Sequence, residues 1–184
     1  MIVKTTKVSG RRVLRFESLD ELLADVEYLA AQPTRQLGNW TFGQVLAHLA
    51  AVYEKSIDGT AYRPNWFVRF LIKTIGPLCK RWVLRRGLPA GIRPPSFMFR
   101  EVAPPEHVTT EDGLRKFRNA IARLKSETQR DWEQCCGLFT REEWDQYHIR
   151  HAELHLSFIV PSSSSPTDSA TNGLTAPNRE SSNA

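Results

Sequence analysis

The chain has 184 residues and 41% of them are hydrophobic, which fits one globular domain with a real core and excludes a wholly disordered chain. Its 25 Lys+Arg and 20 Asp+Glu give a mild formal charge of +5, and no recognised motif accompanies it, so we expect no nucleic-acid partner. No run approaches about 18 uncharged apolar residues, and the N-terminus lacks the apolar core of a signal peptide, so we expect no transmembrane segment. The three cysteines lack a framework spacing, which favours a reduced, cytoplasmic setting.

The first predicted helix covers residues 19–31. Ser18 stands at the expected N-cap and Glu21 follows three residues later, which is the spacing of a capping box. Apolar residues recur behind this cap at helical period, and Pro33 ends the helix because proline lacks a backbone N–H and clashes one turn back. Residues 1–16 are mixed in character, and we expect at most a brief extended arm there.

The second predicted helix begins at Thr41, which forms another capping-box pair with Gln44 and precedes a long apolar face. That face consists of Phe42, Val45, Leu46, Leu49, Val52, Tyr53 and Ile57. His48 shares the sector of this face, so we expect its side chain to lean toward the core. Asp58-Gly59 should end or bend the helix.

A third segment, residues 63–86, combines aromatic and basic residues. Its apolar residues lie near one another on a helix and are Trp66, Phe67, Phe70, Leu71, Ile75, Leu78, Trp82 and Val83. Its basic residues are Arg69, Lys73, Lys80, Arg81, Arg85 and Arg86. Gly76-Pro77 predicts a kink or a split in this helix. The proline-rich connection up to Pro105 is long, and we expect it to fold over the body without forming a helix.

Two more helices are predicted, one from Thr110 to about residue 124 and one from Thr140 to about residue 160. Thr140 and Glu143 form the third capping-box pair, and Pro161 stops the last helix. Four principal helices without a convincing strand pattern predict an all-α bundle.

The predicted domain covers residues 1–160, and a tail covers residues 161–184. The tail consists mainly of Ser, Pro, Thr, Asn and Ala, with a single leucine. Such a segment buries too little apolar surface to offset the entropy of ordering it, so we expect it to be disordered.

Three of the chain's five histidines lie on the last predicted helix. They belong to a stripe with steps of four, three, four and three residues, which is Trp144, His148, His151, His155 and Phe158. His151 and His155 stack on one face and can chelate a single ion, and His148 with His151 can also do so. Since His148 and His155 lie about 10.5 Å apart along the axis, all three do not share one ion.

A third ligand has to come from another helix that faces the same core. His48 is the only histidine with a helical, inward position, whereas His107 lies in the proline-rich connection. We therefore predict a metal triad of His48, His151 and His155. The alternative is that these histidines are satisfied core residues. His148 is then either a base behind the ligands or a half-exposed boundary residue, and Gln44 either orients a ligand or only caps its helix.

Two sequence stretches carry a family resemblance. Leu37-Gly-Asn-Trp-Thr-Phe-Gly-Gln-Val-Leu-Ala-His48-Leu, and Leu138-Phe-Thr-Arg-Glu-Glu-Trp ahead of Arg150-His-Ala-Glu-Leu-His-Leu, resemble an uncharacterised bacterial subfamily of the DinB-like superfamily. The resemblance covers about residues 12–160. It implies a four-helix bundle in which His48, His151 and His155 bind a divalent metal, zinc or nickel, and it suggests a homodimer.

The resemblance also implies a chemistry. Some DinB-like proteins are S-transferases or isomerases that use a low-molecular-weight thiol, so the expected function is a metal-dependent, thiol-dependent transfer, or a related hydrolytic or isomerase reaction, on a small-molecule substrate. The alternative is a non-catalytic bundle with structural histidines that binds a protein partner or a membrane surface. That alternative predicts an open patch near residues 66–82 and no solvent path to the triad.

Overall fold

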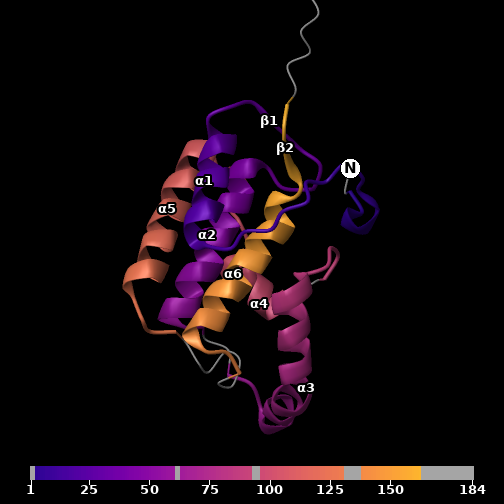
Figure 1. Ribbon diagram of the computed structural model, residues 1–184, viewed down its shortest axis with the longest axis vertical. Coiled ribbons are helices and arrows are strands. Elements are labelled where there is room, and N and C mark those ends of the chain that lie inside the picture. Colours follow the sequence, from indigo (N-terminus) through magenta and orange to yellow (C-terminus); the bar gives the residue numbers. More distant parts are fainter. Residues whose placement is uncertain (1–2, 61–62, 93–95, 131–137, 163–184) are drawn as a thin grey trace, which may run out of the picture.

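The computed structural model describes residues 3–60, 63–92, 96–130 and 138–162, and this part of the chain is mostly helical (Figure 1). Its helices are α1 (Leu19–Ala30), α2 (Phe42–Asp58), α3 (Trp66–Arg86), α4 (Ser96–Val102), α5 (Thr110–Ser126) and α6 (Arg141–Leu156). A short 3-10 helix, η1 (Thr5–Lys7), and two strands, β1 (Thr34–Gln36) and β2 (Ile159–Pro161), complete the described elements. The predicted all-α class is confirmed.

The helix starts follow the capping patterns in the sequence. Reciprocal capping boxes join Thr41 to Gln44 and Thr140 to Glu143, with the threonine hydroxyl and the longer side chain each accepting a backbone N–H. Ser18 caps α1 through its hydroxyl alone. These bonds satisfy N–H groups that have no partner inside the helix, so they fix where each helix begins.

Helices α1, α2, α5 and α6 supply the hydrophobic core, and Figure 1 shows them running side by side. Helices α2 and α5 approach each other closely at two glycines. A Cβ atom on Gly43 would lie 2.4 Å from the carbonyl oxygens of Val108 and Thr109, and one on Gly113 would lie 2.6 Å from the carbonyl oxygen of Gly43. The core residues without measurable exposure include Leu22, Val26, Leu29, Leu46, Leu49, Tyr53, Phe117, Leu124, Ala152 and Leu156.

The N-terminal arm is fastened to α6 by a buried ion pair. Arg150 and Glu153 bond to each other, with side chains only 5% and 9% exposed. The Glu153 carboxylate accepts the backbone N–H of Phe16 at 2.7 Å, and Arg150 donates to the Phe16 carbonyl at 3.1 Å. The pair therefore satisfies the polar backbone of an arm that packs against the core.

A kink or a split was predicted at Gly76-Pro77: α3 is not split, and Figure 1 shows its axis changing direction along its length. Two other predictions about the elements were wrong. The proline-rich connection contains a helix, α4. Helix α6 ends at Leu156, and the chain continues into β2, which pairs antiparallel with β1. Both strands are three residues long, too short for an alternating pattern to show in the sequence.

No helix in the described part of the chain is long and apolar enough to cross a membrane. The adjacent cysteines of the sequence and the predicted tail beyond residue 162 lie outside the described residues.

Candidate metal centre

The structure brings together the three histidines that the sequence singled out. His48 comes from the middle of α2, whereas His151 and His155 come from successive turns of α6. One ring nitrogen from each lies within 4.8 Å of the others. The imidazole centroids are 4.7 to 5.3 Å apart.

The pair on α6 converges through its outer ring nitrogens. The Nε2 atoms of His151 and His155 are 3.0 Å apart, as the i, i+4 spacing allows. Zinc binds imidazole nitrogens at about 2.0–2.1 Å, and ligand nitrogens around a tetrahedral ion then lie roughly 3.3 Å apart. The pair is therefore spaced for one ion, and His48 lies close enough to be the third ligand.

The orientation of His48 is set from outside the triad. Its Nδ1 lies 2.8 Å from the backbone carbonyl oxygen of Val102, the last residue of α4. Because a carbonyl only accepts hydrogen bonds, Nδ1 carries the proton and Nε2 keeps its lone pair. Metal-binding histidines are commonly held in this way by a bond from the other ring nitrogen.

Burial keeps the three imidazoles neutral, the state in which they ligate a metal. It lowers the pKa of His48, an effect that the bond to Val102 partly opposes. It lowers the pKa of His151 to about 3, and the neighbouring His48 adds to the shift. The pKa of His155 lies well below its ordinary value, first through burial and then through His151 and His48. Three neutral imidazoles fit a divalent cation without charge repulsion between the ligands.

Two aromatic rings from other elements lie beside the triad. Trp40, just ahead of the α2 cap, stacks on His155 with 5.4 Å between ring centroids and contacts His48 at 4.8 Å. Phe99 of α4 stacks on Trp40 at 6.3 Å. These rings limit access of water to the histidines from one side.

The triad lines a cavity of about 910 Å³, near the upper end of the range for small-molecule sites. Its walls come from α2, α4, α6, the N-terminal residues 3–6 and the stretch that follows α3. Ile92, which is 60% exposed, also lines it, so the cavity reaches the surface. Much of the lining is aromatic or aliphatic, including Val45, Val52, Phe139 and Tyr147.

His148 lines the same cavity but does not belong to the triad. It is fully buried, so its interpretation as a half-exposed boundary residue was wrong. Its Nε2 lies 2.9 Å from the Ser56 hydroxyl oxygen, and Ser56 itself donates to the Tyr53 carbonyl at 2.7 Å. Ser56 must therefore accept, so His148 carries its proton on Nε2. Within the part of the chain that the structure describes, its Nδ1 has no hydrogen-bond partner, and neither has the buried Nε1–H of Trp144, one turn earlier.

The remaining candidate residues lie elsewhere. Gln44 completes its capping box and also donates to the carbonyls of Pro105 and Glu106 at 3.1 and 2.9 Å, so it fastens the proline-rich connection and is not part of the triad. His107 is exposed and stands outside the cluster. Trp40 and the Val102 carbonyl were missed, because nothing local in the sequence indicates which loop residues reach the histidines.

Comparison with known proteins places the chain in a family. No curated protein and no solved structure matches it. Residues 8–162, most of the chain, match the family described as "Protein of unknown function (DUF1569)", a match that covers all three histidines of the triad. The chain belongs to this family.

Proposed function

We propose that this protein is a DinB-like four-helix metalloprotein that binds one divalent ion, zinc or nickel, through His48, His151 and His155. We further propose that it is an enzyme for a small-molecule substrate, with a thiol-dependent S-transferase reaction, or a related hydrolytic or isomerase reaction, as its chemistry. The observation that carries the proposal is the convergence of three imidazole nitrogens within 4.8 Å, from two helices, in the wall of an accessible cavity.

The hydrogen bonds of the triad argue against purely structural histidines. A buried imidazole in a core normally finds a protein partner for its polar atoms. Here His151 and His155 turn their Nε2 atoms toward each other, and the Nδ1 of His151 has no hydrogen-bond partner among the described residues. The two imidazoles face each other, and their Nε2 atoms do not point at a backbone carbonyl or a carboxylate of the described residues. This arrangement favours a ligand that both rings share.

The chain's own residues divide the work of such a site. The triad would hold the ion, and Val102 would keep the His48 lone pair directed at it. A bound divalent ion supplies Lewis acidity, which lowers the pKa of a water or thiol that it ligates. Trp40 and Phe99 exclude water and offer aromatic surface to an apolar part of a substrate.

Trp144 and His148 form part of the cavity wall near the triad. Their rings stack with 5.6 Å between centroids, and both residues line the cavity. Among the described residues, neither the Trp144 Nε1–H nor the His148 Nδ1 has a hydrogen-bond partner, but both atoms are buried, so we assign the two rings to shaping the cavity and not to bonding a substrate.

The thiol part of the proposal rests on the DinB-like resemblance, and the cavity is compatible with it. Glu101 is the only acidic residue among the described residues that line the cavity, and its carboxylate pairs with Lys55 at 3.4 Å. A thiolate, which carries negative charge, therefore meets little repulsion near the triad.

Metal analysis tests the proposal directly. Protein purified without an affinity tag should contain about one equivalent of zinc or nickel after dialysis, measured by inductively coupled plasma mass spectrometry. His151→Ala should reduce this at least about tenfold, because a three-ligand site loses a ligand. His107→Ala is the matched control, since His107 is exposed and outside the cluster, and it should keep full occupancy. Metal far below one equivalent that the His151 substitution leaves unchanged would refute the proposal.

A further inference from the structure

Helix α3 carries an uncovered apolar face. None of its 21 residues is buried, and Figure 1 shows it standing apart from the core helices. Seven of its large apolar side chains are exposed by 43% to 80% of their surface, and these are Trp66, Phe67, Phe70, Leu71, Ile75, Leu78 and Trp82. On a helical projection they fall within one half of the helix. Exposed apolar patches of this extent usually mark an interaction surface.

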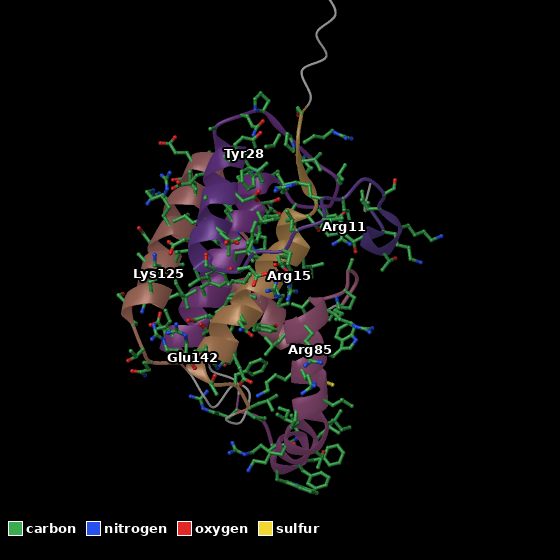
Figure 2. The ribbon with its side chains drawn as sticks, viewed as in Figure 1. Arg11, Arg15, Tyr28, Arg85, Lys125 and Glu142 are labelled. Carbon is green, nitrogen blue, oxygen red and sulfur yellow. The ribbon has the colours of Figure 1, made fainter. Side chains whose placement is uncertain are left out.

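Polar contacts hold the inner side of α3 to the body. Lys80 donates to the Leu138 carbonyl at 2.9 Å and pairs with Glu143 at 2.7 Å. Arg15 donates to the Arg85 carbonyl at 3.1 Å, and Figure 2 labels both side chains at this junction. Figure 2 also shows side chains of α3 extending into open space on the side away from the core. The fold therefore presents this helix outward in a fixed place.

The charge on α3 is entirely positive. It contains Arg69, Lys73, Lys80, Arg81, Arg85 and Arg86 and no Asp or Glu. The other residues of the chain contribute 19 Lys+Arg and 20 Asp+Glu, so the helix accounts for the whole net charge of +5. Aromatic side chains and a concentrated positive charge thus share one exposed helix.

We propose that α3 docks the protein onto an anionic membrane surface. In this mode the aromatic and aliphatic side chains enter the boundary between headgroups and acyl chains, and the basic side chains pair with anionic headgroups. Trp66 and Trp82 suit that depth because indole is amphipathic. Lys73, Arg81 and Arg86 are exposed and have long apolar stems, so their charged ends reach the headgroups while their stems cover apolar surface.

The positive charge of α3 argues against a dimer in which a second copy of this chain packs on its apolar face. Two copies packed through this face would bring the positive charges of both helices together around one apolar contact, with no carboxylate on either helix to balance them. An anionic lipid surface supplies the missing negative charge. The helix lies on the bilayer and does not cross it, since no described helix is apolar enough to span one. The proposal is independent of the metal site.

Flotation with lipid vesicles tests the proposal on the full chain. At low salt the protein should bind vesicles of phosphatidylcholine with 30% phosphatidylserine and should not bind phosphatidylcholine alone. Raising the salt to 0.5 M should weaken the binding at least about tenfold, because the electrostatic part is screened. Tryptophan emission should shift to the blue on binding.

Two variants and two controls locate the contact. The double variant Trp66→Ser with Phe70→Ser removes apolar surface. The double variant Arg81→Gln with Arg86→Gln removes two positive charges, and each lost charge should lower the membrane partition coefficient roughly fivefold. We expect each double variant to weaken binding at least about tenfold. Two control variants should bind vesicles as the wild type does. The first, Tyr28→Ser, removes an exposed aromatic side chain on α1, and the second, Arg35→Gln with Lys116→Gln, removes two positive charges outside α3.

The substituted side chains are exposed, so far-ultraviolet circular dichroism and the unfolding temperature should match the wild type. The salt dependence of vesicle binding is measured on the wild-type protein, so it tests the proposal even if a variant fails to fold. Three results would overturn the proposal: no binding to anionic vesicles at low salt, equal binding to neutral vesicles, or double variants that bind like their controls. A dimer in light scattering that Trp66→Ser with Phe70→Ser converts to a monomer would also overturn it and assign the face to a second copy.

Discussion

The Nδ1 atom of His48 lies 2.8 Å from the carbonyl oxygen of Val102, so the last residue of α4 sets the proton position of a histidine on α2. Helix α4 lies in the connection between α3 and α5, which the sequence predicts to lack helices. The connection is therefore part of the candidate metal centre, because it determines which nitrogen of His48 faces His151 and His155.

The first prediction is that His48 and His148 are opposite tautomers in the metal-free protein. His48 should carry its proton on Nδ1, because Val102 offers only an acceptor, and His148 should carry its proton on Nε2, because Ser56 must accept from it. Two-bond proton–nitrogen correlation spectra at neutral pH distinguish the two forms, and His48→Asn and His148→Asn assign the signals. Finding the same tautomer at both positions would contradict the hydrogen bonding described above.

The second prediction concerns acid stability without metal. Burial first, and then the nearby His151 and Arg130, hold the pKa of His148 well below 6.5. The folded protein then binds fewer protons than the unfolded chain below pH 6.5, so the free energy of unfolding should fall as the pH falls. One such histidine contributes up to about 1.4 kcal/mol per pH unit.

Urea titrations of the metal-free protein between pH 7.5 and pH 5 measure this dependence. Most carboxyl groups titrate below this pH range, so they contribute little to the change. His148→Phe should reduce the slope below pH 6.5 by the contribution of one histidine, whereas His107→Phe, at an exposed site, should leave the slope unchanged. A free energy of unfolding that does not change with pH over this range would show that the buried histidines are not held neutral.

The third prediction concerns the close crossing of α2 and α5. Gly43→Ala places a methyl group 2.4 Å from two backbone carbonyl oxygens, which cannot move without displacing the start of α5. We expect a loss of roughly 1–3 kcal/mol in the free energy of unfolding, as for other overpacked positions. Asn119→Ala, on the exposed side of α5, should be neutral or slightly stabilising because alanine favours helices. Chemical denaturation measures both, and equal stabilities would contradict the packing described here.

The fourth prediction compares two ion pairs with the same i, i+3 spacing. Arg150 and Glu153 are 5% and 9% exposed and also bond the backbone of Phe16, so Glu153→Ala leaves a buried guanidinium without its partner and should cost about 3–5 kcal/mol. Asp112 and Arg115 are 51% and 66% exposed, and Asp112→Ala should cost about 1 kcal/mol or less. Similar losses in urea denaturation would mean that the buried pair does not fasten the arm.

The sequence by itself determined the five longer helices and the identity of the candidate ligands. Capping pairs such as Thr41 with Gln44 and Thr140 with Glu143 specify helix starts through local hydrogen bonds. The spacing of His151 and His155 places them on one face because helix geometry is the same in every protein. Inward placement of His48 followed from the period of its apolar neighbours.

Only the tertiary structure decided what lies between those helices and how the histidines are oriented. The bond from His48 to Val102 and the stacking of Trp40 on His155 join residues from segments whose relative positions depend on the whole fold. The short strands β1 and β2 form because distant segments meet, not because either has a strong local preference. The sequence contains the aromatic and basic residues of α3, and its periodicity shows which of them share a face. Periodicity does not show whether another element covers that face. The exposure of the apolar residues of α3 therefore results from how the other helices pack.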